Sequence, residues 1–314
     1  MRGLLVVNPK ATTTSPRVID LIVHALSDQL ELDVTVTTHK GHGIMLGELA
    51  LQQGLDVVIT LGGDGIVNEV VNGILSNGPG PHVPRIATVP GGSANVFART
   101  IGLPTDSAEA AGQVLDALRA GSTRTIGLGR AGDRWFLANA GLGIDAEIIA
   151  AMERHREAGR TASPTRYFIT TLNEFFRGTN RKEPALTLTR PTGPHGEAGD
   201  RLEGVFLAIV QNASPWTFFG TWPISPCPDA DFDLGLDVFA ARRLRVPTAL
   251  RAARRMLTRT TGGTAGGGLI LWHDQERFTL TATRPVELQI DGEGMGMTTE
   301  VTFSSHPQAL QVVI

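Results

Sequence analysis

The chain has 314 residues, of which 41% are hydrophobic and 19% charged, and this balance excludes an intrinsically disordered protein. The net charge of −3 and the aromatic content of 5% argue against a protein that binds nucleic acid. The single cysteine, Cys227, excludes an internal disulfide and a cysteine-rich metal site.

The first part of the chain, residues 1–125, alternates between short β-branched runs and helical patterns of apolar residues. This alternation predicts a doubly wound parallel sheet, which binds ligands at the carboxyl ends of its strands. The expected strands are Leu4–Val7, Val34–Thr38, Val57–Leu61 and Ile86–Val89. The expected helices begin at Ser15-Pro16 and near Ala94, and span Ile44–Gln53, Ile66–Leu75 and Ser107–Ala120.

After Gly121, strand-like runs are separated by turns rich in Gly, Pro and Asp, which predicts a mainly antiparallel β-sandwich or barrel. Two helical stretches, 146–176 and 246–259, interrupt the strands. The expected strands are Trp135–Asn139, Ala185–Thr189, Gly204–Gln211, Leu234–Phe239, Phe278–Ala282, Val286–Ile290 and Val301–Phe303.

The strongest feature is the segment Leu61–Gly73, with the sequence LGGDGIVNEVVNG, between an apolar strand and an amphipathic helix. Its glycines let the backbone approach a ligand and point N–H groups at a phosphate, and the helix N-terminus adds partial positive charge. A carboxylate here, Asp64, is repulsive to phosphate unless it holds a cation or accepts a proton, and phosphoryl transfer needs both. The alternative is a glycine turn in which Asp64 caps the helix, but the number of matched features favours a phosphate site.

Three further turns follow strands of the same sheet. The segment Val89–Arg99, with the sequence VPGGSANVFAR, repeats the design, and Ser93 either donates to a phosphate or ribose oxygen or caps the helix. Asn8–Thr14 and Thr37–Lys40 end the first two strands and are rich in hydrogen-bond donors. In a parallel sheet all four turns lie at one edge, which predicts a single nucleotide site.

The order and spacing of three motifs resemble the catalytic domain of the diacylglycerol kinase superfamily, which includes bacterial diacylglycerol kinases and sphingosine and ceramide kinases. The motifs are Asn8-Pro9, Gly-Gly-Asp-Gly-x-x-Asn-Glu at 62–69 and Pro-x-Gly-Ser-x-Asn-x-x-Ala-Arg at 90–99. The resemblance continues through Gly141–Ala146 and Asp291–Glu293. It implies an NAD kinase-like nucleotide domain, 1–125 with the segment 300–314 returning to it, and a β-rich lipid domain, 126–299.

The resemblance implies ATP as phosphoryl donor and Mg²⁺ bound mostly by ATP, with Asp64 as the protein's candidate metal ligand. Asp64 and Glu293 become the candidate bases for the substrate hydroxyl, and Asp145, Arg156 and Arg166 the candidate substrate-binding residues. The nucleotide site implied by the resemblance comprises Asn8, Pro9, Lys10, Ala11, Thr12, Thr38, Gly62, Gly63, Asp64, Gly65, Ile66, Val67, Asn68, Glu69, Ser93 and Asp291.

The segment Asp291–Glu293 has a simpler explanation. An Asp-Gly pair between two strands predicts a hairpin turn, and the residues alone favour that turn. Only the resemblance makes Glu293 a catalytic candidate. If it holds, we expect Asp64 and Glu293 to face one another across an interdomain cleft.

Four positions depart from the family pattern. Ile66 replaces a common threonine, and Val96 and Gly127 stand where bacterial diacylglycerol kinases carry aspartates. Leu234 stands in place of the aspartate near a structural Mg²⁺. The acceptor lipid and the structural metal therefore stay open.

Two surface features also have two readings. Arginines crowd Arg242–Arg259 without an acid, which fits either a solvated helix face or contact with an anionic membrane. Trp216, Phe218, Phe219 and Trp222 are either core residues or a rim for acyl chains. The segment Gly127–Gly132 fits a dinucleotide fingerprint, but a strand follows it instead of a helix, so we reject that reading.

These observations favour a kinase that converts ATP and a lipid alcohol, similar to diacylglycerol or sphingosine, into ADP and a phospholipid. The alternatives are a kinase for a soluble substrate such as NAD and a nucleotide-binding protein without catalysis. No apolar run approaches the roughly 20 residues that span a bilayer, and the chain starts with no cleavage signal. We therefore expect a cytoplasmic protein that meets the inner membrane face peripherally, and the oligomeric state stays open.

Overall fold

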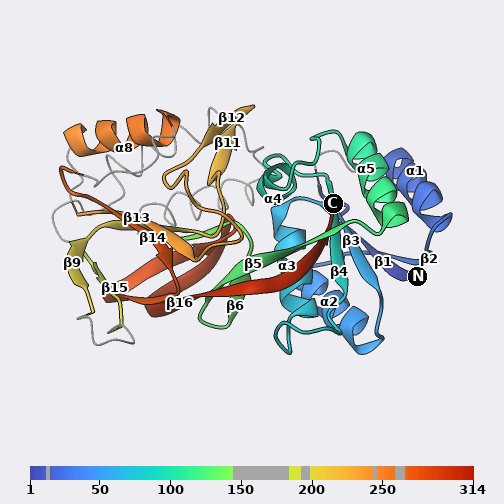
Figure 1. Cartoon of the computed structure of the whole chain (residues 1–314), viewed down its shortest axis with the longest axis horizontal. Helices are drawn as coiled ribbons and strands as arrows, with labels where there is room; N and C mark the ends of the chain where they lie inside the picture. The colour runs from blue at the N-terminus through green and yellow to red at the C-terminus, as the bar shows by residue number, and fades with distance from the viewer. Residues whose placement is uncertain (12–14, 144–183, 192–198, 243–245, 259–265) are drawn as a thin grey trace. The chain divides into compact units, whose positions relative to one another are not determined.

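A computed structural model describes residues 1–11, 15–143, 184–191, 199–242, 246–258 and 266–314. The chain divides into two compact units, unit 1 from residues 1–128 with 307–314 and unit 2 from residues 129–306 (Figure 1). Outside the described residues lie Thr12, Asp145, Arg156 and Arg166 and the helix expected over 146–176.

The sheet of unit 1 is parallel, with the strand order β16–β4–β3–β1–β2. The inner strand β3 is fully buried, whereas four of the six residues of the edge strand β2 are exposed. The last strand enters only through its C-terminal end, where Val312 pairs with Ile86. The bounds are β1 (Arg2–Val7), β2 (Glu31–Val36), β3 (Val57–Gly62), β4 (Arg85–Pro90) and β16 (Glu293–Val313).

Helices cover both faces of this sheet. The helices α1 and α5 share one hydrophobic core with the strands, and Figure 1 shows α2 and α3 together on the other side. In the described part of the chain, no helix has the length and apolar character needed to cross a membrane. The bounds are α1 (Pro16–Ser27), α2 (His42–Gln52), α3 (Asp64–Ile74), α4 (Val96–Thr100) and α5 (Ser107–Ala120).

Local sequence signals explain where α1 and α5 begin and end. Ser15 accepts a hydrogen bond from Val18 N–H at 3.3 Å, and Pro16 occupies the first helical position. Asp106 caps α5 through two backbone N–H groups, and Gly121 ends it in the left-handed conformation. These caps match the helix limits expected from the sequence.

The helices α2 and α3 cross at two glycines. A Cβ added to Gly73 would lie 2.2 Å from the carbonyl oxygen of Ile44, and one added to Gly47 would lie 2.5 Å from that of Val70. Since any side chain would push the helices apart, this contact determines how α3, which starts at Asp64, lies in unit 1.

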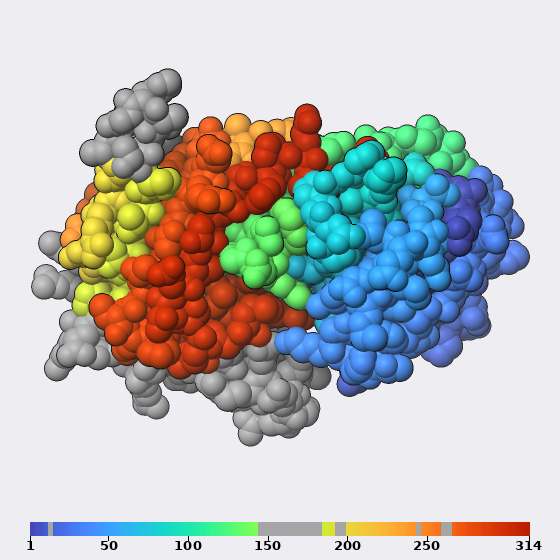
Figure 2. Space-filling model, turned by 90° about the horizontal axis from the view of Figure 1, so that it is seen from below, coloured from blue at the N-terminus to red at the C-terminus, as the bar shows by residue number. Residues whose placement is uncertain are grey.

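Unit 2 is built from antiparallel strands, with the order β14–β13–β10–β7–β15–β16 and the additional pairs β5–β6 and β8–β9. In Figure 2 the strands β15 and β16, coloured orange to red, spread across the visible face of this unit. The strand β5 (Thr123–Ala131) begins in unit 1 and ends in unit 2. The remaining elements are β6 (Arg134–Phe136), β7 (Asn139–Gly143), β8 (Leu186–Thr189), β9 (Arg201–Val205), β10 (Leu207–Gln211), β11 (Thr217–Phe219), β12 (Trp222–Ile224), β13 (Leu236–Ala241), α8 (Val246–Thr258), β14 (Leu269–Gln275) and β15 (Arg277–Ile290).

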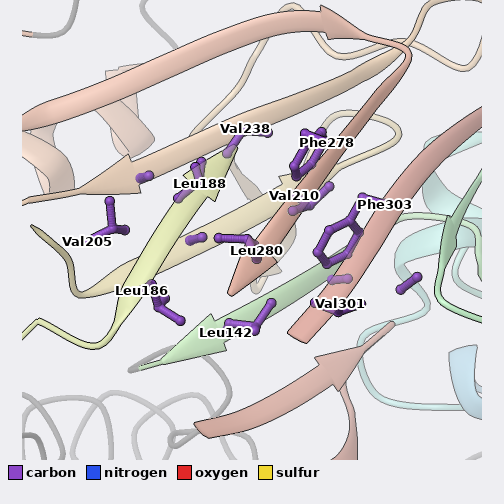
Figure 3. Close-up of a cluster of buried hydrophobic side chains, with 14 of the residues drawn as sticks. Leu142, Leu186, Leu188, Val205, Val210, Val238, Phe278, Leu280, Val301 and Phe303 are labelled. Carbon is purple, nitrogen blue, oxygen red and sulfur yellow. The ribbon is translucent and has the colours of Figure 1, made fainter. Parts of the chain in front are cut away.

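Aromatic rings organise the core of unit 2 (Figure 3). Phe278 stacks on Phe303 with ring centroids 5.2 Å apart, and Phe136 meets Phe303 edge-on. Gly129 pairs with Phe136 across β5 and β6, and a Cβ there would lie 2.1 Å from the ring. This glycine therefore belongs to a strand, and the rejection of the dinucleotide fingerprint is confirmed.

The fold class expected from the sequence, an α/β unit followed by a mainly antiparallel one, is confirmed, but several strand limits were wrong. The expected strands Phe278–Ala282 and Val286–Ile290 are one strand, β15, with a register shift between them. The short strand expected at Val301–Phe303 is the middle of the 21-residue β16. Its start contains Gly294 and Gly296, which have little strand propensity, so pairing with β15 decides its conformation.

Candidate active site

Three turns meet at the carboxyl edge of the parallel sheet of unit 1. They follow β1, β3 and β4, which run in the same direction in adjacent positions. The N–H of Asn8 donates to the carbonyl of Leu61 at 2.9 Å, and the N–H of Gly91 donates to that of Gly62 at 2.7 Å. The backbone hydrogen bonds of the sheet thus continue into the turns and hold them together.

The glycines of these turns are required by close contacts. A Cβ on Gly62 would lie 2.7 Å from Ile66 Cγ2 and 3.1 Å from Asn8 Cβ. A Cβ on Gly92 would lie 2.7 Å from the Cα of Gly63. The two Gly-rich turns therefore touch backbone to backbone, which is possible only without side chains.

Asp64 connects the turns after β3 and β4. One carboxylate oxygen accepts the N–H of Val96 at 3.0 Å, and the other accepts the N–H of Phe97 at 2.9 Å. These are the first N–H groups of α4, so Asp64 caps a helix. The sequence analysis raised the alternative that Asp64 caps a helix, and Asp64 does so. The helix that it caps is α4, whereas α3 is the helix that begins at Asp64.

Asn95 shapes the turn after β4. It has a left-handed backbone with φ of 48°, its side-chain oxygen accepts the N–H of Gly92 at 2.9 Å and its amide donates to the Gly92 carbonyl at 2.8 Å. Ser93, between these residues, is exposed. That position suits a hydroxyl that binds a phosphate or ribose oxygen.

Arg99 lies in α4 near Asp64. Partial burial lowers the pKa of the Arg99 guanidinium, and the Asp64 carboxylate opposes that shift. Arg99 is thus a cation held close to the carboxylate of the glycine turn.

The turns after β1 and β2 present exposed polar groups. Asn8 forms a local turn by accepting the N–H of Lys10 at 3.0 Å, and Pro9 and Lys10 are exposed. The backbone N–H of Thr38 lies 3.2 Å from His42 Nδ1, so the imidazole fixes the start of this turn. Ala11 is partly buried.

The side chains that follow in α3 face the interior. Ile66, Val67, Asn68 and Glu69 are buried. The two carboxylate oxygens of Glu69 accept the N–H groups of Gly41 at 2.7 Å and Gly43 at 2.9 Å, at the start of α2. This geometry favours a structural role for Glu69 as the cap of α2.

In unit 2, the hairpin turn expected at Asp291-Gly292 is confirmed. Both residues have positive φ, 46° and 79°, and they join β15 to β16. The Asp291 carboxylate accepts the N–H groups of Leu137, Ala138 and Asn139 at 2.9 to 3.0 Å. These bonds favour a structural role for Asp291, while Glu293 follows the turn and is partly buried.

The described residues do not fit a metal site made by the protein alone, since no group of three or more His, Cys, Asp or Glu side chains among them could hold an ion. Among the described residues of the turns after β1, β3 and β4, Asp64 is the one carboxylate, and each of its oxygens accepts an N–H group. A Mg²⁺ at this site would therefore depend on nucleotide oxygens.

The sequence reasoning assigned no role to Asn95, Arg99 or His42. Asn95 and Arg99 stand within the recognised motif, so their spacing from Asp64 was a usable signal. The contact between His42 and Thr38 carried no comparable signal, because a histidine at a helix start has many other roles.

The fold and the linked turns define a class of protein: a parallel α/β unit with Gly-rich turns at the carboxyl ends of its strands, combined with an antiparallel β unit. Within this class, residues 2–131 match the family model of the diacylglycerol kinase catalytic domain. The resemblance inferred from the motifs is thereby confirmed for residues 2–131.

Curated relatives support the same conclusion. A diacylglycerol kinase of Staphylococcus haemolyticus is 31% identical over 118 residues, which are 38% of this chain and 34% of that protein. One of Staphylococcus carnosus is 31% identical over 139 residues, which are 44% of this chain and 42% of that protein. The chain thus matches less than half the length of these relatives.

Solved structures share the whole fold. The crystal structure of a diacylglycerol kinase from Bacillus anthracis str. Sterne has a TM-score of 0.71 at 19% identity and covers 99% of this chain and 96% of its own. A second structure from this organism, with the same coverage, has a TM-score of 0.75 at 21% identity. At such identities the likeness extends to the fold alone.

Proposed function

We propose that the protein is an ATP-dependent kinase that transfers the γ-phosphoryl group of ATP to a lipid hydroxyl. The observation that carries the proposal is the pair of Gly-rich turns in backbone contact at the edge of a parallel sheet, with Asp64 bonded across them. Phosphoryl transfer depends mainly on positioning and charge stabilisation, and glycine turns at helix starts supply both.

In the proposed reaction the lipid oxygen attacks the γ-phosphorus, the bond to the ADP oxygen breaks and a base takes the hydroxyl proton. The first turn of α3 and the exposed Ser93 bind phosphate oxygens, and Arg99 adds positive charge. Mg²⁺, when bound with ATP, neutralises phosphate charge. The turns after β1 and β2, which expose Pro9, Lys10 and Thr38, contact the parts of the nucleotide other than the phosphates.

Of the two candidate bases, Glu293 is preferred. A proton on Asp64 would replace a hydrogen bond to Val96 or Phe97 and loosen the start of α4. We therefore assign Asp64 to positioning the turns and Glu293 to the proton transfer. The expectation that Glu293 reaches the substrate hydroxyl near Asp64 is part of this proposal.

The test is a panel assay with radiolabelled ATP and Mg²⁺ on the full chain. Diacylglycerol, sphingosine and a bacterial lipid extract are offered in mixed micelles, with NAD as a soluble acceptor. We expect label in a lipid product, and Glu293→Gln to lower kcat more than about 100-fold with ATP binding retained. Label in NAD alone would overturn the lipid acceptor.

A second candidate is a nucleotide-binding protein without catalysis. The observation that favours it is that Asp64 is fully engaged as a helix cap, while Val96 and Gly127 stand where acids are expected. Its signature is ATP binding by calorimetry with no product from any acceptor.

A further inference from the structure

The helix α8 of unit 2 carries two apolar faces. On one side, Ala252 and Met256 pack against a small core around Ile209 and Phe239, and Thr248 is buried. On the other side, Val246, Leu250 and Leu257 are 50, 66 and 49% exposed. Their spacing of four and seven residues puts them on one exposed stripe of the helix.

The hairpin β11–β12 exposes aromatic residues beside this helix. Phe219 pairs with Trp222 at the hairpin tip, and the two are 55 and 59% exposed. Of the two readings of these aromatics, core packing suits Trp216, which contacts the small core, but not the exposed pair. A tryptophan and a phenylalanine at an exposed turn are costly unless something covers them.

The hairpin and α8 belong to one surface. The N–H of Ser225, directly after β12, donates to the carbonyl of Met256 in α8 at 3.0 Å. Figure 1 shows the helix and the hairpin along the same border of unit 2. We call this surface, made of the α8 stripe and the hairpin tip, the α8–hairpin surface.

The charge of this surface is positive. Arg251 and Arg254 are exposed on α8, and neither 217–224 nor 246–258 contains an acidic residue. An acidic side chain, Asp229, lies nearby but outside both segments. Asp229 raises and Arg255 lowers the pKa of the buried Cys227 thiol, so both charges lie close to that group. Arg254 and Arg251 flank the apolar stripe on one side, and the Arg251 guanidinium lies 3.5 Å from the carbonyl oxygen of Gly267.

We infer that the α8–hairpin surface docks on an anionic lipid bilayer. Leucine and valine side chains enter the boundary of the acyl chains, Trp222 lies at headgroup level, and the arginines contact lipid phosphates. The charge complementarity distinguishes this occupant from a second copy of the chain, whose matching surface would bring arginine against arginine. The inference stands independently of the proposed kinase activity.

The experiment is co-sedimentation of the full chain with vesicles in the absence of nucleotide. Vesicles of phosphatidylcholine are compared with vesicles that also contain phosphatidylglycerol. We expect binding to the anionic vesicles only, weakened by salt, and more than about tenfold weaker for Arg251→Glu with Arg254→Glu. Leu250→Ser with Leu257→Ser should weaken it similarly.

Matched variants elsewhere in unit 2 serve as controls. Met297 is 65% exposed and Arg284 is exposed, and both lie on β15 or β16. Met297→Ser and Arg284→Glu should bind vesicles like the wild type. A spectroscopic readout is independent of these variants: anionic vesicles should shift the tryptophan emission to the blue, and Trp222→Phe should remove the shift.

Three results would overturn the inference. One is wild-type protein that stays in the supernatant with anionic vesicles. Another is vesicle binding that neither the double arginine variant nor the double leucine variant changes, when the melting temperature of each shows that it is folded. The third is a dimer in sedimentation velocity that Leu250→Ser dissociates, which would assign the surface to a second copy.

Discussion

At the residue scale, Asp64 has a structural task that is separable from catalysis. Its two hydrogen bonds to the start of α4 hold the turn after β4 against the turn after β3. Asp106 provides a natural comparison, because its carboxylate also caps a helix through two N–H groups, at the start of α5.

We therefore predict that Asp64→Ala and Asp106→Ala each lower the free energy of unfolding by about 1 kcal/mol. Only Asp64→Ala should lower turnover to less than about a tenth, a barrier change above ~1.4 kcal/mol. Urea unfolding and the radiolabel assay measure the two effects. Equal activity of the two variants would remove Asp64 from the site.

The second residue-scale prediction concerns His306, which meets Trp135 edge-on at 4.8 Å. Burial lowers the pKa of His306, and Arg130 and Arg277 lower it further. The unfolded chain thus takes up this proton at a higher pH than the folded one, so stability falls as pH falls through about 6.5.

His306→Gln should therefore lose less stability than the wild type between pH 7.5 and 5.5, measured by urea unfolding. The pKa of His273 is raised by its hydrogen bond to Asp237. The contribution of His273 to the free energy of unfolding is therefore complete below about pH 6.5 and is lost as the pH rises. Because His273 is present in both proteins, the difference between His306→Gln and the wild type reports on His306 alone. Identical dependence of unfolding free energy on pH in the two proteins would contradict the prediction.

At the element scale, two glycines in helices have opposite roles. Gly73 in α3 meets the backbone of α2, where a Cβ would be 2.2 Å from the carbonyl oxygen of Ile44. Gly112 in α5 has nothing within 4 Å of the same position. The first glycine is required by packing, and the second only lowers helix propensity.

Gly73→Ala should destabilise the protein by more than about 2 kcal/mol through overpacking. Because α3 begins with Asp64, the variant should also bind ATP more weakly. Gly112→Ala, the matched control, should stabilise by about 0.5–1 kcal/mol and bind ATP normally. Calorimetry measures unfolding and ATP binding for both variants. If Gly73→Ala leaves both unchanged, the contact between α2 and α3 does not require a glycine at this position.

At the scale of the whole molecule, the strand β16 takes part in both units. Its long first part pairs with β15 in unit 2, and its last residues belong to unit 1, where Val312 pairs with Ile86. Val312 is fully buried, whereas the adjacent Gln311 is exposed. The last strand of the chain thus completes the sheet that carries the Gly-rich turns.

Val312→Asp should cost more than about 3 kcal/mol, because it buries an unpaired carboxylate beside β4. ATP binding should be lost with it. Gln311→Asp places the same carboxylate one residue away in water and should leave both properties unchanged. Thermal unfolding with and without ATP tests this, and normal ATP binding by folded Val312→Asp would show that the strand is dispensable for the site.

The sequence by itself determined the order of strands and helices in unit 1, the caps of α1 and α5 and the Gly-rich turns, because these depend on local signals within a few residues. It also favoured the Asp291-Gly292 hairpin. Only the tertiary structure decided that Asp64 caps α4, that Asp291 binds three N–H groups near Asn139 and that Glu69 caps α2. Each of these carboxylates bonds to N–H groups from another part of the chain, and such pairings depend on packing between elements, which local propensity does not encode.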